Sequence, residues 1–334
     1  MKQKYSIILL SFLFFTGPVS LSALTIKLGS LAPIGSPWDY NLKKIGAEWG
    51  KVSQGQVVLK IYPGGIVGDE DDMIRKIRIG QLDAAGITGV GLSRIFNGVL
   101  AIQLPLLVRD EQELEYVLDK IRPYFEKNIE EKGFKVLLWH TAGWAYFFSK
   151  KPVVYPEDLK KLKFWVWEGD PDQLEAWKEQ NFQPVPLPAT EIMTALQSGM
   201  AESFTTSPLT AAAYQWFGVA PHMCEMKWAP FIGTVIIATK VWNKIPADQQ
   251  VKFMEIVLRI GKAMKGEISK ADEKAVEIMK QNGLVTHPVN EDIVKQWKSA
   301  VDQGFRKLVG KSIEKESYER VKTYIDEYRK AHGK

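Results

Sequence analysis

The sequence of 334 residues is short of three things: cysteine, long apolar runs and, in its middle, arginine. Cys224 is the single cysteine, so no disulfide can form within the chain. After the first 23 residues no apolar run approaches the roughly 20 residues that a membrane-spanning helix needs. No arginine lies between Arg122 and Arg259. These absences exclude a disulfide scaffold and a multispanning membrane protein.

The N-terminus has the order of a secretory signal peptide. Lys2 and Lys4 precede an apolar run over residues 7–15, and small residues end at Ser22-Ala23. We therefore predict a signal peptide over residues 1–23 and an exported protein, with an uncleaved N-terminal anchor as the alternative. No cysteine follows the apolar run, so no lipoprotein attachment site is predicted.

Charge gives little indication of a nucleic-acid partner. The formal net charge is +5, and the lysines and arginines are spread along the chain among acidic residues. A nucleic-acid-binding surface would instead gather basic residues into a block or stripe. The chain that follows residue 23 is long enough to build two lobes around sizeable cores.

Strand and helix patterns alternate, which predicts an α/β fold. The predicted strands cover residues 24–28, 56–62, 82–85, 134–139, 163–166, 203–205 and 231–239. The clearest predicted helices cover residues 37–52, 111–132, 171–181 and 191–198. The pattern restarts after Lys150-Lys151-Pro152, so we expect two α/β units with a cleft between them.

A long stretch of helical periodicity follows Pro246 and ends near Asn282-Gly283. As one helix it would extend about 54 Å at 1.5 Å per residue, enough to cross both lobes. Gly261 and Gly266 weaken it, so two consecutive helices are an equal alternative. The predicted organisation is a first segment of lobe I over 24–144 and lobe II over 145–234. Residues 235–334 are predicted to form a returning strand, a long lobe-spanning helix and C-terminal helices that contribute to both lobes.

Several short motifs occur in a fixed order along the chain. They are Tyr62-Pro63-Gly64-Gly65, Gly68-Asp69-Glu70, Arg78-Ile79-Gly80, Leu104-Pro105-Leu106, Pro184-Val185-Pro186, Gln197-Ser198-Gly199 and Trp242-Asn243-Lys244-Ile245-Pro246. The ordered set resembles the dicarboxylate-type solute-binding proteins of tripartite ATP-independent periplasmic (TRAP) transporters. The resemblance implies a periplasmic protein with two α/β lobes, a cleft between them and a long helix across both. It also implies lobe closure on a solute and delivery to a membrane permease.

The chain departs from this family where the resemblance places the ligand. Family members typically carry an arginine at the position of Trp165, and often a second at the position of Ala145. Thr206 stands where an asparagine is expected, and Ala189 where an aromatic residue is expected. A buried carboxylate without a cationic partner is costly to desolvate. Lysines at 150, 151, 160, 161 and 163 are a possible replacement, although such charge runs usually lie in solvent.

Aromatic residues gather where the arginines are missing, and we therefore predict an apolar or amphiphilic solute. The predicted ligand-binding residues are Trp38, Thr88, Leu106, Trp144, Ala145, Trp165, Trp167, Ala189, Thr206 and Trp216. One alternative is a quaternary ammonium solute in an aromatic cage, with Glu168 or Asp170 nearby. A carboxylate solute is the other. Ordinary core packing of these aromatics also stays open.

No catalytic cluster, cofactor motif or metal site is predicted. The four histidines lie far apart in the sequence, and Cys224 two residues after His222 is a weak signal. An exported enzyme using acids such as Glu70 and Glu191 is an alternative class, as is a non-transporting interaction protein. Some members of the resembled family work with a separate tetratricopeptide-repeat protein, so the resemblance includes a candidate soluble partner of that kind.

Overall fold

The computed structural model describes residues 23–168, 171–264 and 266–333. The predicted signal peptide falls almost entirely outside these residues. The strands are β1 (Leu24–Ser30), β2 (Val57–Tyr62), β3 (Ala84–Thr88), β4 (Phe134–Ser149), β5 (Lys163–Trp167), β6 (Gln183–Leu187), β7 (Ser203–Thr206), β8 (His222–Cys224), β9 (Ala229–Ala238) and β10 (Val285–His287). Ten strands join in the order β2-β1-β3-β9-β4-β7-β5-β6, with β8 on β4 and β10 on β8.

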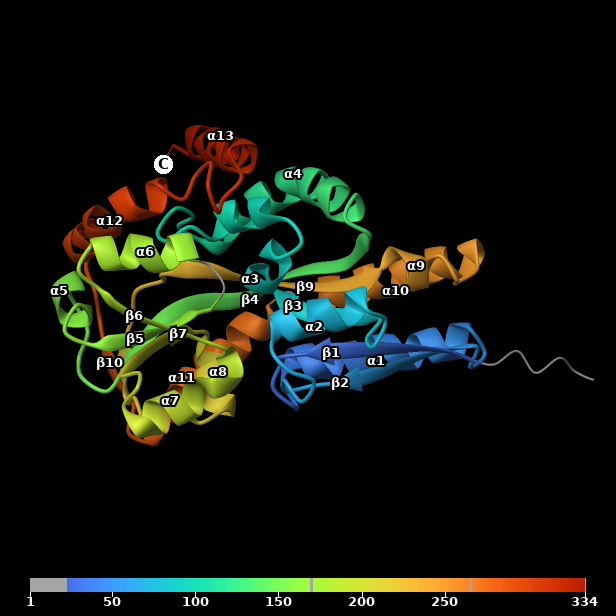
Figure 1. The fold of residues 1–334 in the computed structure, drawn as a ribbon, viewed down its shortest axis with the longest axis horizontal. Helices are drawn as coiled ribbons and strands as arrows, with labels where there is room; N and C mark the ends of the chain where they lie inside the picture. Colours follow the sequence, from blue (N-terminus) through green and yellow to red (C-terminus); the bar gives the residue numbers. More distant parts are fainter. Residues whose placement is uncertain (1–22, 169–170, 265, 334) are drawn as a thin grey trace, which may run out of the picture.

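Two long antiparallel strands, β4 and β9, connect two lobes (Figure 1). Lobe I is built around β2, β1 and β3, which run parallel to one another. Lobe II is built around β7, β5 and β6, also parallel. The mixed sheet and the two lobes agree with the predicted α/β fold. The predicted strand at 134–139 is wrong in length, because β4 continues to Ser149 across the junction.

Helices cover both faces of this sheet. In the first half they are α1 (Pro37–Val52), α2 (Glu70–Arg78), α3 (Gly89–Ser93), η1 (Asn97–Gln103), α4 (Glu111–Glu130), α5 (Pro156–Leu159) and α6 (Pro171–Glu179). In the second half they are η2 (Ala189–Glu191), α7 (Ile192–Ser198), α8 (Pro208–Ala213), η3 (Trp216–Gly218), α9 (Thr239–Trp242), α10 (Ala247–Met264), α11 (Glu267–Gln281), α12 (Glu291–Arg306) and α13 (Lys315–Ala331). Figure 1 shows α13 lying beside α4 at the outer edge of the molecule.

Helix α1 illustrates how local sequence sets an element that borders the cleft. The Ser36 side chain caps the helix by accepting from the N–H of Asp39, and Pro37 occupies the first helical position. Trp38, Leu42 and Ile45 then recur at helical spacing and are buried against the sheet. The observed bounds are those predicted from the sequence.

The prediction of one long helix across both lobes is wrong, because the periodic stretch after Pro246 forms two consecutive helices. Helix α10 ends at Met264, and α11 begins after Gly266, whose φ of 81° lies in the left-handed region. Helix α10 packs on α1 and β4, whereas α11 packs on α8 and β4. The pair therefore reaches both lobes. No helix of the described residues is long and apolar enough to cross a membrane.

The predicted lobe boundaries can be located on this fold. The boundary after residue 144 coincides with the place where β4 leaves β9, after Ala145, and begins to pair with β7, at Tyr146. The boundary after residue 234 lies inside β9. The division into these segments stays a prediction.

Candidate functional site

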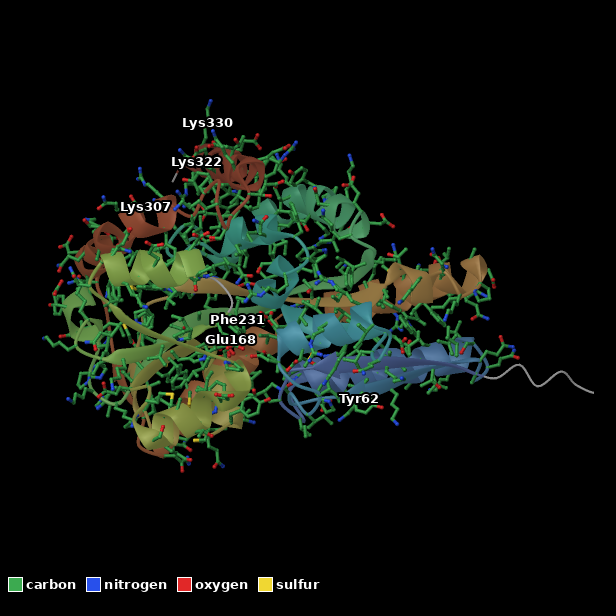
Figure 2. The ribbon with its side chains drawn as sticks, in the orientation of Figure 1. Tyr62, Glu168, Phe231, Lys307, Lys322 and Lys330 are labelled. Carbon is green, nitrogen blue, oxygen red and sulfur yellow. The ribbon has the colours of Figure 1, made fainter. Side chains whose placement is uncertain are left out.

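A cavity of about 540 Å³ lies between the two lobes. Lobe I contributes the loop from β1 to α1, the Gly64-Gly65 turn and the end of β3. Lobe II contributes β5, the η2–α7 segment and the segment from β7 to η3. Phe231, from β9, lies near the middle of the molecule, where the lobes meet (Figure 2). The volume is that of a small-molecule site.

Seven of the ten predicted ligand-binding residues line this cavity. They are Trp38, Thr88, Trp165, Trp167, Ala189, Thr206 and Trp216. They come from six separate elements of both lobes, which the fold brings together. The Trp38 ring lies close to Gly233, where an added Cβ would come within 2.4 Å of the ring.

The structure places Leu106, Trp144 and Ala145 away from this cavity. The strand register of β4 shifts between Thr141 and Trp144, so the in-and-out alternation is interrupted and Ala142 contributes to the cavity instead. Trp144 lies on a separate groove, with the Lys227 ammonium 5.3 Å from its ring centroid.

Ala145 is buried beside Phe147 and Phe164, behind the cavity wall. The N–H of Leu106 donates to the Trp228 carbonyl, which fixes that loop outside the cavity lining. A family-based alignment cannot anticipate a local shift in register. The three residues therefore do not share a site with the other seven.

Aromatic rings form much of the cavity wall. The rings of Trp165 and Trp167 meet edge to face with centroids 4.8 Å apart, and Trp167 stacks on Phe231. The Trp165 indole N–H donates to the Leu187 carbonyl at 2.8 Å, which fixes this side chain. The position where the resemblance implies an arginine is thus filled by a buried, oriented indole.

The described lining residues include no lysine, arginine or histidine. Three of the five suggested lysines interact elsewhere, and the other two, Lys151 and Lys163, are exposed and outside the lining. The Lys150 ammonium donates to the Leu196 carbonyl, Lys160 pairs with Glu157, and Lys161 pairs with Asp158. A carboxylate in this cavity would have no cationic side chain within the described lining.

Glu70 is the acid that the described lining does contain. Its Oε1 accepts the Thr88 N–H at 2.6 Å, and its Oε2 accepts the Thr88 hydroxyl at 2.8 Å. Burial raises the pKa of Glu70 to about 7, despite these bonds, which favour the charged form. The suggested counter-ion Glu168 is exposed and is not part of the lining, and Asp170 lies outside the described residues.

Hydrogen bonds join the lobes beside the cavity. Oδ2 of Asp69, at the start of α2, accepts the N–H of Ala189 at 2.6 Å. The Tyr214 hydroxyl donates to the Leu31 carbonyl at 2.9 Å. These contacts connect the two walls directly, so the structure is in a closed conformation.

A larger hollow of about 930 Å³ lies among β4, α4, α10 and α11. Its rim carries many charged side chains, including Glu111, Asp119 and Lys262. We take the smaller cavity as the candidate site because its walls are largely apolar and because the hydrogen bonds between the lobes lie beside it.

Two histidines that are distant in the sequence come together outside the cavity. Nδ1 of His222 lies 3.1 Å from Nε2 of His287, a pairing that sequence spacing alone did not reveal. Burial, and then the proximity of His287, lower the pKa of His222. Burial also raises the pKa of the nearby Cys224 thiol to about 11, so it stays protonated and is a poor nucleophile near neutral pH.

The fold and the site define a class: a two-lobed binding protein whose ligand cavity lies between the lobes. The sequence model of a family described as "Bacterial extracellular solute-binding protein, family 7" matches residues 28–312. The chain belongs to this family. The resemblance to TRAP solute-binding proteins is thereby confirmed, and the family is periplasmic and binds solutes rather than acting enzymatically.

Individual relatives agree with this placement. The sialic acid-binding periplasmic protein SiaP of Vibrio cholerae is 24% identical over 278 residues, which are 80% of this chain and 84% of the relative. An uncharacterized Haemophilus influenzae protein is 28% identical over 198 residues, 59% of this chain and 60% of the relative. The fold is similar to that of a TRAP periplasmic solute binding protein from Xanthobacter autotrophicus with bound β-D-galacturonate. The TM-score is 0.82 at 18% identity, over 90% of this chain and 99% of that chain.

Proposed function

We propose that this protein captures an uncharged, apolar or amphiphilic small molecule by lobe closure and delivers it to a TRAP-type permease. The observation that carries the proposal is the set of described cavity residues, which is rich in tryptophan and contains no cationic side chain. The named relatives bind sialic acid and galacturonate, both of which are carboxylates. The proposed ligand class therefore differs from theirs.

Desolvation is the physical reason for the difference. A carboxylate that leaves water needs charge-assisted hydrogen bonds, and a forked arginine supplies two. Here Trp165 takes up that position, with its N–H already donated to Leu187. An apolar molecule in the same space gains roughly 25 cal/mol for each Å² of surface removed from water.

A polar group on the solute would also be accommodated. The indole nitrogens of Trp38 and Trp167 are buried without a hydrogen-bond partner among the described residues. A buried donor left unpaired costs about 1–3 kcal/mol. A solute oxygen that reaches either N–H on closure would remove this cost, which favours an amphiphile over a pure hydrocarbon.

A quaternary ammonium solute is the second candidate. Glu70 favours it, because one buried carboxyl group among tryptophan rings is a suitable environment for a cation without N–H donors. Both Glu70 oxygens already accept bonds from Thr88, which limits how far the carboxyl can turn to such a ligand. Competition between an uncharged amphiphile, such as a long-chain alcohol, and choline for the purified protein distinguishes the two candidates.

The substitution Trp165→Arg tests the proposal directly. It supplies the arginine that the family carries, and we expect loss of the apolar ligand together with a gain of affinity for a carboxylate such as succinate. Leu258→Arg is the matched control, because Leu258 is 58% exposed and lies outside the cavity lining. Titration calorimetry provides both affinities. Wild-type protein that binds succinate as tightly as the Trp165→Arg variant contradicts the proposal.

The remaining partners and the processing of the chain are also proposed. We expect the permease to recognise the closed state, since both lobes then present one continuous surface. Cleavage after Ala23 predicts an N-terminus at Leu24, which sequencing of the exported protein measures. A tetratricopeptide-repeat partner, and a non-transporting role in which the lobes serve only as a docking surface, stay alternatives. A purified protein without ligand and without closure would favour the docking role.

A further inference from the structure

The facing histidines lie on two short strands of lobe II. Strands β8 and β10 run parallel, with His222 opposite Val285 and Cys224 opposite His287. The histidines are thus two positions apart along the pair, so both side chains project from the same face. Their ring centroids are 5.2 Å apart with an interplanar angle of 38°, and both rings are partly exposed.

The separation of the two nitrogens is that of neighbouring ligands on one metal ion. Bonds from imidazole nitrogen to zinc are roughly 2.0–2.1 Å long, which places two ligands of a tetrahedral or octahedral ion roughly 3.0–3.4 Å apart. Nδ1 of His222 and Nε2 of His287 are 3.1 Å apart. Without a metal, the same geometry is a hydrogen bond in which the two rings share one proton.

Backbone hydrogen bonds hold the two strands that carry the rings. The N–H of Val285 donates to the Pro221 carbonyl at 2.8 Å, and the N–H of Glu225 donates to the His287 carbonyl at 2.9 Å. These bonds lie on either side of the histidine pair and fix the strand register. The backbone of both ligands is therefore already positioned when the imidazoles bind one ion.

We propose that His222 and His287 form a surface site for a divalent transition-metal ion such as Zn²⁺, Ni²⁺ or Cu²⁺, for which imidazole is a suitable ligand. No group of three or more metal-binding side chains gathers anywhere in the described residues, so water molecules complete the coordination. Glu225 does not join the pair, since its carboxylate lies 3.5 Å from the Lys280 ammonium. The site is consequently weaker than a closed structural zinc site.

The site is independent of the solute cavity. Neither histidine is among the cavity's described lining residues. The metal would connect β8 to β10, the strand that follows α11, and so tie the end of α11 to lobe II. Metal binding should therefore raise the thermal stability of the protein without changing its affinity for the solute.

The test uses the mature protein without a polyhistidine tag and titrates it with Ni²⁺ alone. We expect one ion per chain. His222→Ala or His287→Ala should lower the affinity about 10²-fold, because each variant holds the ion by one imidazole instead of two. His332→Ala is the matched control, because His332 is exposed and lies at the end of α13, away from the pair. Circular dichroism checks that each variant is folded, and His287→Gln replaces His287→Ala if that variant is not.

Electron paramagnetic resonance with Cu²⁺ gives a second readout. Nitrogen hyperfine structure from two imidazoles in the wild type, and from one in each single variant, supports the site. Wild-type affinity equal to that of the double variant His222→Ala/His287→Ala overturns it, as does a spectrum with one imidazole only. In that case the pair is a hydrogen bond and nothing more.

Discussion

At the scale of single residues, Glu70 is the most perturbed group of the candidate site. Its side chain is almost fully buried, and no cation of the described lining compensates its charge. Its pKa is raised from 4.5 to about 7, chiefly by desolvation. The protonated form is therefore favoured in the folded state. With a pKa of about 7, roughly half of the Glu70 carboxyl groups are protonated near neutral pH, so the cavity carries less negative charge than an ordinary glutamate would give it.

This shift predicts how stability depends on pH. A raised folded-state pKa gives a stabilising contribution that is complete below pH 4.5 and lost as the pH rises to about 7. At about 1.4 kcal/mol per pKa unit the contribution is roughly 3 kcal/mol. We expect the thermal midpoint of the ligand-free protein to fall over this range, and Glu70→Gln to remove part of the fall.

Asp272 contributes a second part of the fall. Burial raises its pKa to about 7 as well, so its contribution is lost in the same direction. Glu191→Gln is the control, since Glu191 is exposed and lies near Glu70 in the fold. A Glu70→Gln variant whose pH profile matches that of the wild type would contradict this account.

At the scale of elements, the irregular part of β4 decides which side chains reach the cavity. Gly143 lies within the register shift and has a φ of 90°, in the left-handed region. A Cβ at this position would lie 2.1 Å from Oδ2 of Asp272, whose Oδ1 accepts the N–H of Leu209. The Asp272 carboxyl group therefore lies where three elements meet: the irregular part of β4, helix α11 and the start of α8.

Gly143→Ala is expected to destabilise the protein by about 2–4 kcal/mol. A backbone strain of about 1 kcal/mol comes from the positive φ, and the remainder from displacement of the buried Asp272 carboxyl. Gly283→Ala isolates the first contribution, because Gly283 has a φ of 97° and nothing within 4 Å of the added Cβ. Urea unfolding measures both. If both variants lost the same free energy of unfolding, the contact with Asp272 would contribute nothing to stability.

Elements with strong local signals were predictable, and those set by long-range pairing were not. Ser36 and Pro37 mark the start of α1, and the predicted bounds are the observed ones. The short strands β8 and β10 have almost no local signal, because they exist through their pairing with β4 and with each other. For the same reason the sequence did not predict the histidine pair or the displacement of Trp144 and Ala145.

At the scale of the whole molecule, closure brings the two cavity walls together. Tyr214 of lobe II stacks on Trp216 with centroids 5.1 Å apart, while its hydroxyl donates to Leu31 of lobe I. In a second bond between the lobes, Asp69 of lobe I accepts the N–H of Ala189 of lobe II. A solute that contacts both walls favours this closed state, and these bonds add to its stability.

Tyr214→Phe removes one bond between the lobes and keeps the ring. A hydrogen bond contributes about 1 kcal/mol net, so we expect solute affinity to fall about fivefold through an easier opening of the lobes. Small-angle scattering of the loaded protein should show a larger open fraction. Tyr40→Phe is the control, because Tyr40 is 65% exposed. Unchanged affinity in Tyr214→Phe would show that this bond does not contribute to closure.

The nature of the solute is the central claim, and one measurement tests it most directly. Native mass spectrometry of the purified protein, followed by solvent extraction, identifies the molecule that occupies the cavity. The account predicts an uncharged apolar or amphiphilic molecule that is lost in Trp165→Arg. A small carboxylate that stays bound in the wild type would contradict it, and would require an anion site built without any cationic side chain of the described lining.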